Sequence, residues 1–94
     1  MDLKAFKASL HQGQPPEDLG RPLLALWHEA KGDWDKAHLL AQAEDNATGA
    51  WVHAYLHRVE GDLENAGYWY GRAKRPRSAA ALRDEWDEIA TALF

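Results

Sequence analysis

The sequence predicts an all-α protein, and three observations support that prediction. Residues that favour strands are scarce, because Val occurs twice, Ile once and Thr twice in 94 residues. Alanine and leucine dominate, and apolar residues recur at spacings of three and four. Turn residues and helix caps interrupt this pattern at short intervals. We therefore expect five to six short helices, stacked as antiparallel hairpins in a single domain over residues 1–94.

The positions of these turn residues and caps give the bounds of the expected helices. They cover residues 2–12, 22–31, 34–44, 48–59 and 63–74, and a last helix runs from a cap at Ser78 nearly to Phe94. The five tryptophans then fall one on each helix from the second to the sixth: Trp27, Trp34, Trp51, Trp69 and Trp86. Each side chain buries roughly 150–250 Å² when packed, so we expect the tryptophans to form much of a compact core.

The first three helices have recognisable ends. Asp2 can cap the first helix, and Gly13 ends it. Pro22 suits the first position of the second helix, because that position needs no N–H group. Gly32 ends the second helix and Asp33 caps the third.

The last three helices are delimited in the same way. Residues 44–49 (EDNATG) form a turn before the fourth helix. Gly61 ends that helix and Asp62 caps the fifth. Pro76 prevents the fifth helix from continuing, and Ser78 is the expected cap of the sixth.

An internal repeat links the two central hairpins. Residues 31–43 (KGDWDKAHLLAQA) align with residues 60–72 (EGDLENAGYWYGR) at an offset of 29. Each copy reads Gly-Asp-x-acid-x-Ala. The glycine accepts the left-handed conformation that ends a helix, the aspartate caps the next helix, and the alanine admits a neighbouring helix. The repeat therefore predicts two similar helix-turn-helix units.

This repeat resembles the tetratricopeptide repeat, a pair of antiparallel helices. Ala66, Tyr70 and Ala73 match the Ala-x3-aromatic-x2-Ala pattern of that repeat, and Ala37 matches it in the first copy. The resemblance covers about residues 18–77. It implies two stacked hairpins between terminal helices, and a role in binding a protein or peptide.

The last helix carries a narrow apolar stripe. Its residues are Leu82, Trp86, Ile89 and Leu93. Small helical stacks need their hydrophobic ends covered, so we expect this helix to cap the stack. The spacing is also close to that of a coiled-coil seam, which leaves a homodimer through the C-terminal helix as the alternative.

The fourth helix contains a candidate metal site. His53, His57 and Glu60 lie within one arc of the helix, and histidines four residues apart can reach one metal ion. His38 completes the candidate set, with His28 or Asp33 as other sources of a further ligand. The metalloprotease motif is excluded because Ala54 stands where that motif has glutamate. The alternative is that these histidines bond to polar groups between helices and bind no metal.

The fifth helix contains the candidate contact residues. We expect Trp69 and Tyr70 to lie in the core and Tyr68 to point outward beside Arg72. Together with His53 and His57, Tyr68 and Arg72 form the predicted binding surface. The interior glycines Gly67 and Gly71 each cost about 1 kcal/mol relative to Ala. We therefore expect another helix or a bound peptide to approach them closely.

A basic run follows the same helix. Residues 72–77 (RAKRPR) contain four basic side chains. Cations are favourable at a helix C-terminus, and this is the interpretation we favour. Contact with phosphate or an acidic peptide is the alternative.

Composition excludes several classes of function. The chain has no cysteine and a net charge of −4, so disulfides, thiolate zinc sites and a dedicated nucleic-acid interface are not expected. It has no apolar stretch long enough to span a membrane and no signal peptide, which indicates a cytoplasmic protein without membrane association. No catalytic residue is assigned and no cofactor is expected beyond the divalent metal alternative. The leading hypothesis is a small protein-interaction module rather than an enzyme.

Overall fold

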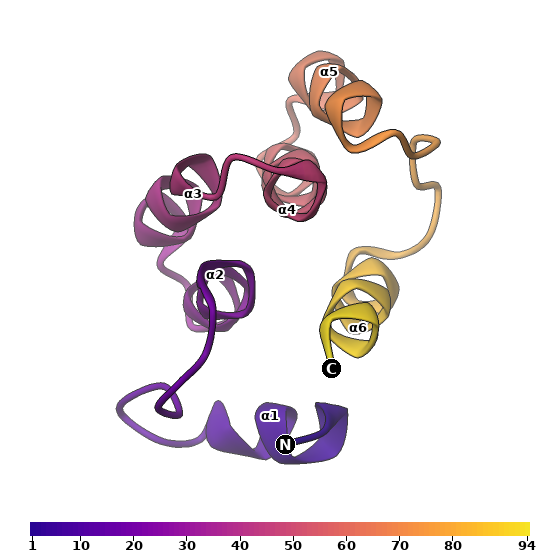
Figure 1. Ribbon diagram of the computed structural model, residues 1–94. Coiled ribbons are helices and arrows are strands. Elements are labelled where there is room, and N and C mark those ends of the chain that lie inside the picture. The colour runs from indigo at the N-terminus through magenta and orange to yellow at the C-terminus, as the bar shows by residue number, and fades with distance from the viewer.

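The computed structural model describes residues 1–94 and is all-helical, as predicted (Figure 1). The helices are α1 (Leu3–Ser9), α2 (Arg21–Ala30), α3 (Trp34–Ala43), α4 (Ala47–Val59), α5 (Leu63–Ala73) and α6 (Leu82–Leu93). Each of α2 to α6 carries one tryptophan, as expected. None of the six is both long and apolar enough to cross a membrane.

The two Gly-Asp turns have the predicted conformations. Gly32 and Gly61 have φ values of +90° and +86°, in the left-handed region that favours glycine. The Asp33 carboxylate accepts a hydrogen bond from the Lys36 N–H, and the Asp62 carboxylate accepts one from the Asn65 N–H, both at 3.1 Å. The turns therefore fold α2 with α3 and α4 with α5 into two hairpins.

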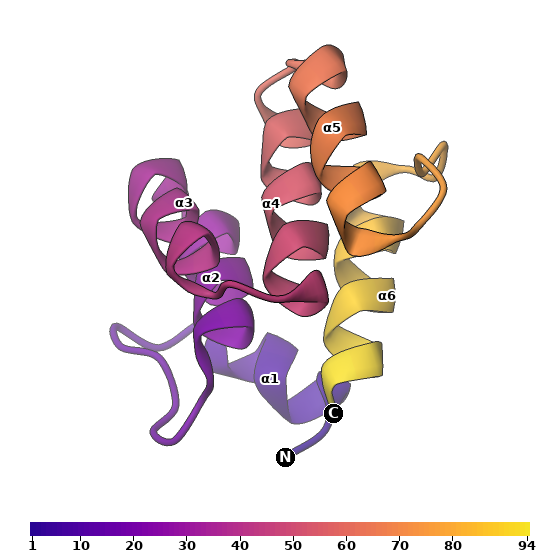
Figure 2. The same cartoon turned by 45° about the horizontal axis from the view of Figure 1, so that its top comes forward.

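Helix α4 occupies the centre of the molecule. It packs against α2, α3, α5 and α6, and all of its residues from Gly49 to His57 are buried. Helix α6 runs beside α4 and α2, and α1 crosses below α2 and contacts α6 (Figures 1 and 2). All six helices contribute side chains to one hydrophobic core. The face that the two hairpins turn toward α6 is therefore covered by the chain itself.

The C-terminal stripe packs inside the molecule. Trp86 and Ile89 are 1% and 0% exposed, and the Trp86 indole N–H donates a hydrogen bond to the Leu26 carbonyl at 3.0 Å. The Trp86 ring also stacks on Phe6, with centroids 5.4 Å apart. The stripe therefore acts as the intramolecular cap. It is not a free seam for the alternative homodimer, because its central side chains already belong to the chain's own core.

The predicted start of the last helix is wrong. Helix α6 begins at Leu82, and Ser78 does not cap it. The Ser78 hydroxyl instead accepts a hydrogen bond from the Ala80 N–H at 3.2 Å, which forms a local turn. The Arg58 guanidinium donates a hydrogen bond to the Ala80 carbonyl at 2.6 Å and ties this segment to α4. The first helix is also shorter than expected and ends at Ser9.

The glycines of α5 do not mark a close helix contact, contrary to expectation. A Cβ at Gly67 would collide with the guanidinium of Arg77, and a Cβ at Gly71 would meet nothing within 4 Å. The tightest glycine is Gly49, where a Cβ would collide with the Glu44 carbonyl. Gly49 therefore permits the close turn between α3 and α4.

The basic run after α5 is distributed over separate partners. The Arg75 guanidinium lies 3.4 Å from the centroid of the Trp51 ring, and Arg77 fills the space beside Gly67. The Arg72 guanidinium donates a hydrogen bond to the Tyr68 hydroxyl at 3.0 Å. Three of the four basic side chains of the run therefore contact other residues of the chain.

A buried carboxylate joins α4, α5 and α6. Glu85 of α6 is 1% exposed. Its oxygens accept hydrogen bonds from Arg58 at 2.6 Å, from the Tyr70 hydroxyl at 2.6 and 2.7 Å, and from the Trp51 indole at 3.2 Å. Burial and the hydrogen bond to Glu85 raise the pKa of Tyr70 above its ordinary range, so it remains a neutral donor.

Candidate functional site

Three histidines meet between α3 and α4. His38 of α3 is half-buried, and His53 and His57 of α4 are only 4% and 5% exposed. One ring nitrogen of each lies within 4.8 Å of a ring nitrogen of both others. The Nε2 atoms of His38 and His53 are 3.0 Å apart, so the N–H of one ring donates a hydrogen bond to the ring nitrogen of the other. We call these three residues the histidine cluster.

Two tryptophans hold the cluster in place. Trp34 stacks on His38 with centroids 4.8 Å apart, and its indole N–H donates a hydrogen bond to the Leu56 carbonyl at 2.8 Å. Trp69 of α5 stacks on His53 with centroids 3.8 Å apart and an interplanar angle of 13°. The ring planes of His38 and His53 are therefore fixed from both sides of α4.

Hydrogen bonds determine the tautomer of His57. Its Nδ1 lies 2.6 Å from a Glu60 carboxylate oxygen, and its Nε2 lies 3.3 Å from the side-chain nitrogen of Asn65. The Glu60 oxygen can only accept and the Asn65 amide nitrogen can only donate. In its neutral form His57 therefore carries its proton on Nδ1, toward Glu60, and a lone pair on Nε2. A carboxylate behind the histidine is the usual outer partner of a metal-bound imidazole.

Glu60 therefore has a different place from the one predicted. We expected it to be a metal ligand beside His53, but the structure places it behind His57. It also belongs to a second group with His57 and Asp62, whose ligand atoms lie within 4.8 Å of one another. Both carboxylates of that group are exposed, and such acidic groups are common without a metal. The histidine cluster is the better candidate because two of its three members, His53 and His57, are buried.

The surroundings of His38 and His53 favour neutral imidazoles. Burial, together with the neighbouring His38 and His57, lowers the pKa of His53 from its ordinary value of 6.5 to about 4. Burial is also the main cause that lowers the pKa of His38. Neutral rings have lone pairs that can bind a metal ion.

These shifts predict an acid-sensitive fold. In the unfolded chain His53 takes up a proton near pH 6.5, whereas in the folded chain it does so only near pH 4. The contribution of neutral His53 to the free energy of unfolding is therefore complete above pH 6.5 and is lost as the pH falls toward 4. We expect the free energy of unfolding, measured by urea titration in a metal chelator, to fall by about 1 kcal/mol more between pH 7 and pH 5 in the wild type than in His53→Gln. An equal fall in both proteins would contradict this assignment.

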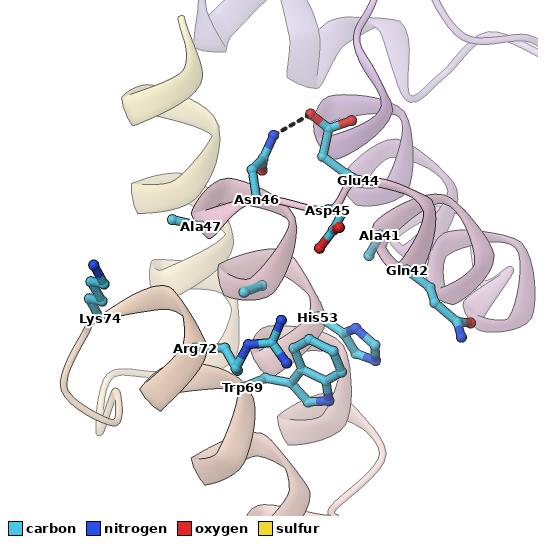
Figure 3. A pocket seen from close by; sticks show the side chains of 11 residues that line it. Ala41, Gln42, Glu44, Asp45, Asn46, Ala47, His53, Trp69, Arg72 and Lys74 are labelled. Atoms are coloured by element: carbon cyan, nitrogen blue, oxygen red, sulfur yellow. Dashed lines mark hydrogen bonds between the residues drawn. The ribbon is translucent and has the colours of Figure 1, made fainter.

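A pocket of about 350 Å³ adjoins the cluster and shares His53 with it (Figure 3). One side is the turn between α3 and α4, with Glu44, Asp45 and Asn46. The opposite side is α5 and the residue after it, with Trp69, Arg72 and Lys74. Figure 3 shows the His53 and Trp69 rings side by side at the base of this space.

The predicted binding surface is divided between two environments. Tyr68 is 56% exposed and bonded to Arg72, so the expected outward orientation is confirmed. His53 and His57 are buried and belong to the cluster beneath. Tyr70 lies in the core as expected, whereas Trp69 is only half-buried and lines the pocket. The other suggested ligands, His28 and Asp33, are outside the cluster.

Two supporting residues were not identified from the sequence. Asn65 bonds to Nε2 of His57, and Trp34 stacks on His38. Each of them lies four residues from another residue of the site on the same helix, Trp34 before His38 and Asn65 before Trp69. Helical neighbours at this spacing share a face, which was the signal that could have found them.

No protein-family model, curated protein or solved structure matches this chain. Function must therefore be inferred from the side chains and their geometry.

Proposed function

We propose that this protein binds a divalent transition-metal ion through His38, His53 and His57. The observation that carries the proposal is the convergence of three ring nitrogens within 4.8 Å. A zinc ion with Zn–N distances of about 2.0–2.1 Å holds tetrahedral nitrogen ligands roughly 3.3–3.4 Å apart. The rings therefore need to move by only about 1–1.5 Å to share one ion.

The ligand type indicates the class of metal. Imidazole nitrogen suits zinc, copper and nickel, whereas magnesium and calcium prefer oxygen ligands. The hydrogen bond from His57 Nδ1 to Glu60 orients the ring and increases its basicity. Three protein ligands also leave a coordination position for water or another ligand, as in zinc sites with three histidines.

The expected result is one zinc or nickel ion per chain. Isothermal titration of metal-free protein, with elemental analysis of the product, measures this stoichiometry. His57→Gln removes a ligand and is expected to abolish binding, whereas Glu60→Gln, which keeps the ligands, is expected to weaken it about 10–100-fold. His28→Gln and His11→Gln remove histidines outside the cluster and serve as matched controls.

Two outcomes would overturn the proposal. One is wild-type protein that binds much less than one ion per chain. The other is binding that survives His57→Gln but is lost in His11→Gln or His28→Gln, which would place the metal elsewhere. Circular dichroism of each variant establishes that it is folded before its binding is compared.

A protein-interaction role is the second candidate, favoured by one specific observation. Leu63 and Tyr68 of α5 are large side chains that are 61% and 56% exposed. Aromatic and arginine side chains are frequent at the centres of interfaces, and Arg72 is bonded to Tyr68. The resemblance to tetratricopeptide repeats supports the same role. A photoreactive side chain at position 68, used for cross-linking in the native cell, tests it.

A further inference from the structure

The pocket beside His53 has opposite charges on its two sides. Arg72 and Asp45 both line it, and in Figure 3 their charged groups point into it from α5 and from the α3–α4 turn. The ion pairs of the structure include neither residue. By contrast, Arg21, Arg58 and Arg83 each pair with a glutamate.

Neighbouring side chains orient the guanidinium of Arg72 and leave part of it free to bind an anion. One of its terminal nitrogens donates a hydrogen bond to the Tyr68 hydroxyl at 3.0 Å. Its guanidinium lies 5.5 Å from the centroid of the Trp69 ring and 5.9 Å from that of Tyr68. These contacts orient the planar group and leave further N–H donors without a protein acceptor. A guanidinium in this state matches a carboxylate, which it can bind through two parallel hydrogen bonds.

The turn opposite offers an anion for a cationic group. The neighbouring Glu44 is already engaged, because it accepts hydrogen bonds from Arg21 at 3.1 Å and from Asn46 at 2.8 Å. Asp45 has no such partner and is the free carboxylate of this wall. An ammonium group placed between Asp45 and the base of the pocket would form an ion pair with it.

The apolar part of the lining suits a small apolar group. Ala41, Ala47 and Ala50 contribute methyl groups, and Trp69 contributes an aromatic edge. A volume of about 350 Å³ lies at the small end of the range for ligand pockets. The space thus accommodates a small molecule with a carboxylate, an ammonium group and an apolar side chain.

We infer that this pocket binds a free apolar α-amino acid, with its carboxylate on Arg72 and its ammonium group on Asp45. The inference goes beyond the proposed metal binding and does not depend on it. His53 forms a common wall of the two sites, but the recognising charges come from residues outside the histidine cluster.

Three matched ligands test the inference on metal-free protein in a chelator. L-Phenylalanine carries both charges, N-acetyl-L-phenylalanine lacks the ammonium charge, and L-phenylalanine amide lacks the carboxylate. We expect isothermal titration to detect L-phenylalanine and to show at least about tenfold weaker binding of each derivative. Arg72→Gln and Asp45→Asn should each weaken the binding of L-phenylalanine by a similar factor. Lys36→Gln and Asp18→Asn each remove one charge of the same sign outside the pocket. These two control variants should bind L-phenylalanine as tightly as the wild type does.

Each other outcome overturns the inference in a distinct way. Equal binding of the N-acetyl derivative would identify the ligand as a peptide C-terminus. Equal binding of the amide would identify it as an amine or a peptide N-terminus. If neither L-phenylalanine nor L-leucine bound, the pocket would not be a site for apolar amino acids. None of these results affects the metal proposal, because that proposal is tested by metal stoichiometry.

Discussion

Replacing Arg58 with methionine is expected to lower the free energy of unfolding by about 3–5 kcal/mol, because it leaves a buried carboxylate without its cation. Glu85 is 1% exposed, and the Arg58 guanidinium is its only ion-pair partner, at 2.6 Å. Tyr70 and Trp51 would still donate hydrogen bonds to Glu85, but neither carries a charge. Arg58 also ties the segment before α6 to α4 through the Ala80 carbonyl.

Urea unfolding followed by circular dichroism measures this loss. Lys7→Met is the matched control, because Lys7 also pairs with a carboxylate, that of Asp87, but the two side chains are 49% and 36% exposed. We expect Lys7→Met to cost about 1 kcal/mol or less. If the two variants lost the same amount of unfolding free energy, burial of Glu85 would not be the reason for the loss in Arg58→Met. For a chain of this size, a loss of 3–5 kcal/mol is a large part of the total stability.

The helical architecture could be predicted because its signals are local. Gly32 with Asp33, and Gly61 with Asp62, determine two turns by backbone conformation and by side-chain capping within three residues. Such signals depend on neighbours in the sequence and not on the tertiary fold. The start of α6 was missed because Ser78 has two local choices. It could cap a helix or form a short turn, and the long-range bond from Arg58 to Ala80 accompanies the turn.

The candidate site could be predicted only in part, for a related reason. Helical spacing places His53 and His57 on one face of α4. It does not show that Glu60 bonds to Nδ1 of His57. It also does not show that the two histidines are buried. Their burial follows from the central position of α4, which packs against α2, α3, α5 and α6. The unpaired state of Arg72 also emerges only when every other charged partner has been placed.

The position of Trp86 could likewise not be determined from the sequence alone. Its replacement by alanine is the second change for which we expect a large loss of the free energy of unfolding. From the sequence, Trp86 could belong to a core or to a dimer seam. The structure buries it to 1% exposure, stacks it on Phe6 and bonds its indole to the Leu26 carbonyl. Trp86→Ala is therefore expected to lower the free energy of unfolding by about 3–5 kcal/mol, through lost burial and the cavity left behind.

Two measurements distinguish this expectation from an interface role. Urea unfolding gives the stability, and sedimentation equilibrium gives the mass in solution. Leu82→Ala is the control on the same helix, because Leu82 is 36% exposed and its loss should cost much less. If Trp86 were an interface residue, the variant would remain folded and change only in mass. Because the ring joins α1, α2 and α6 within one chain, we expect the variant to lose stability at every protein concentration.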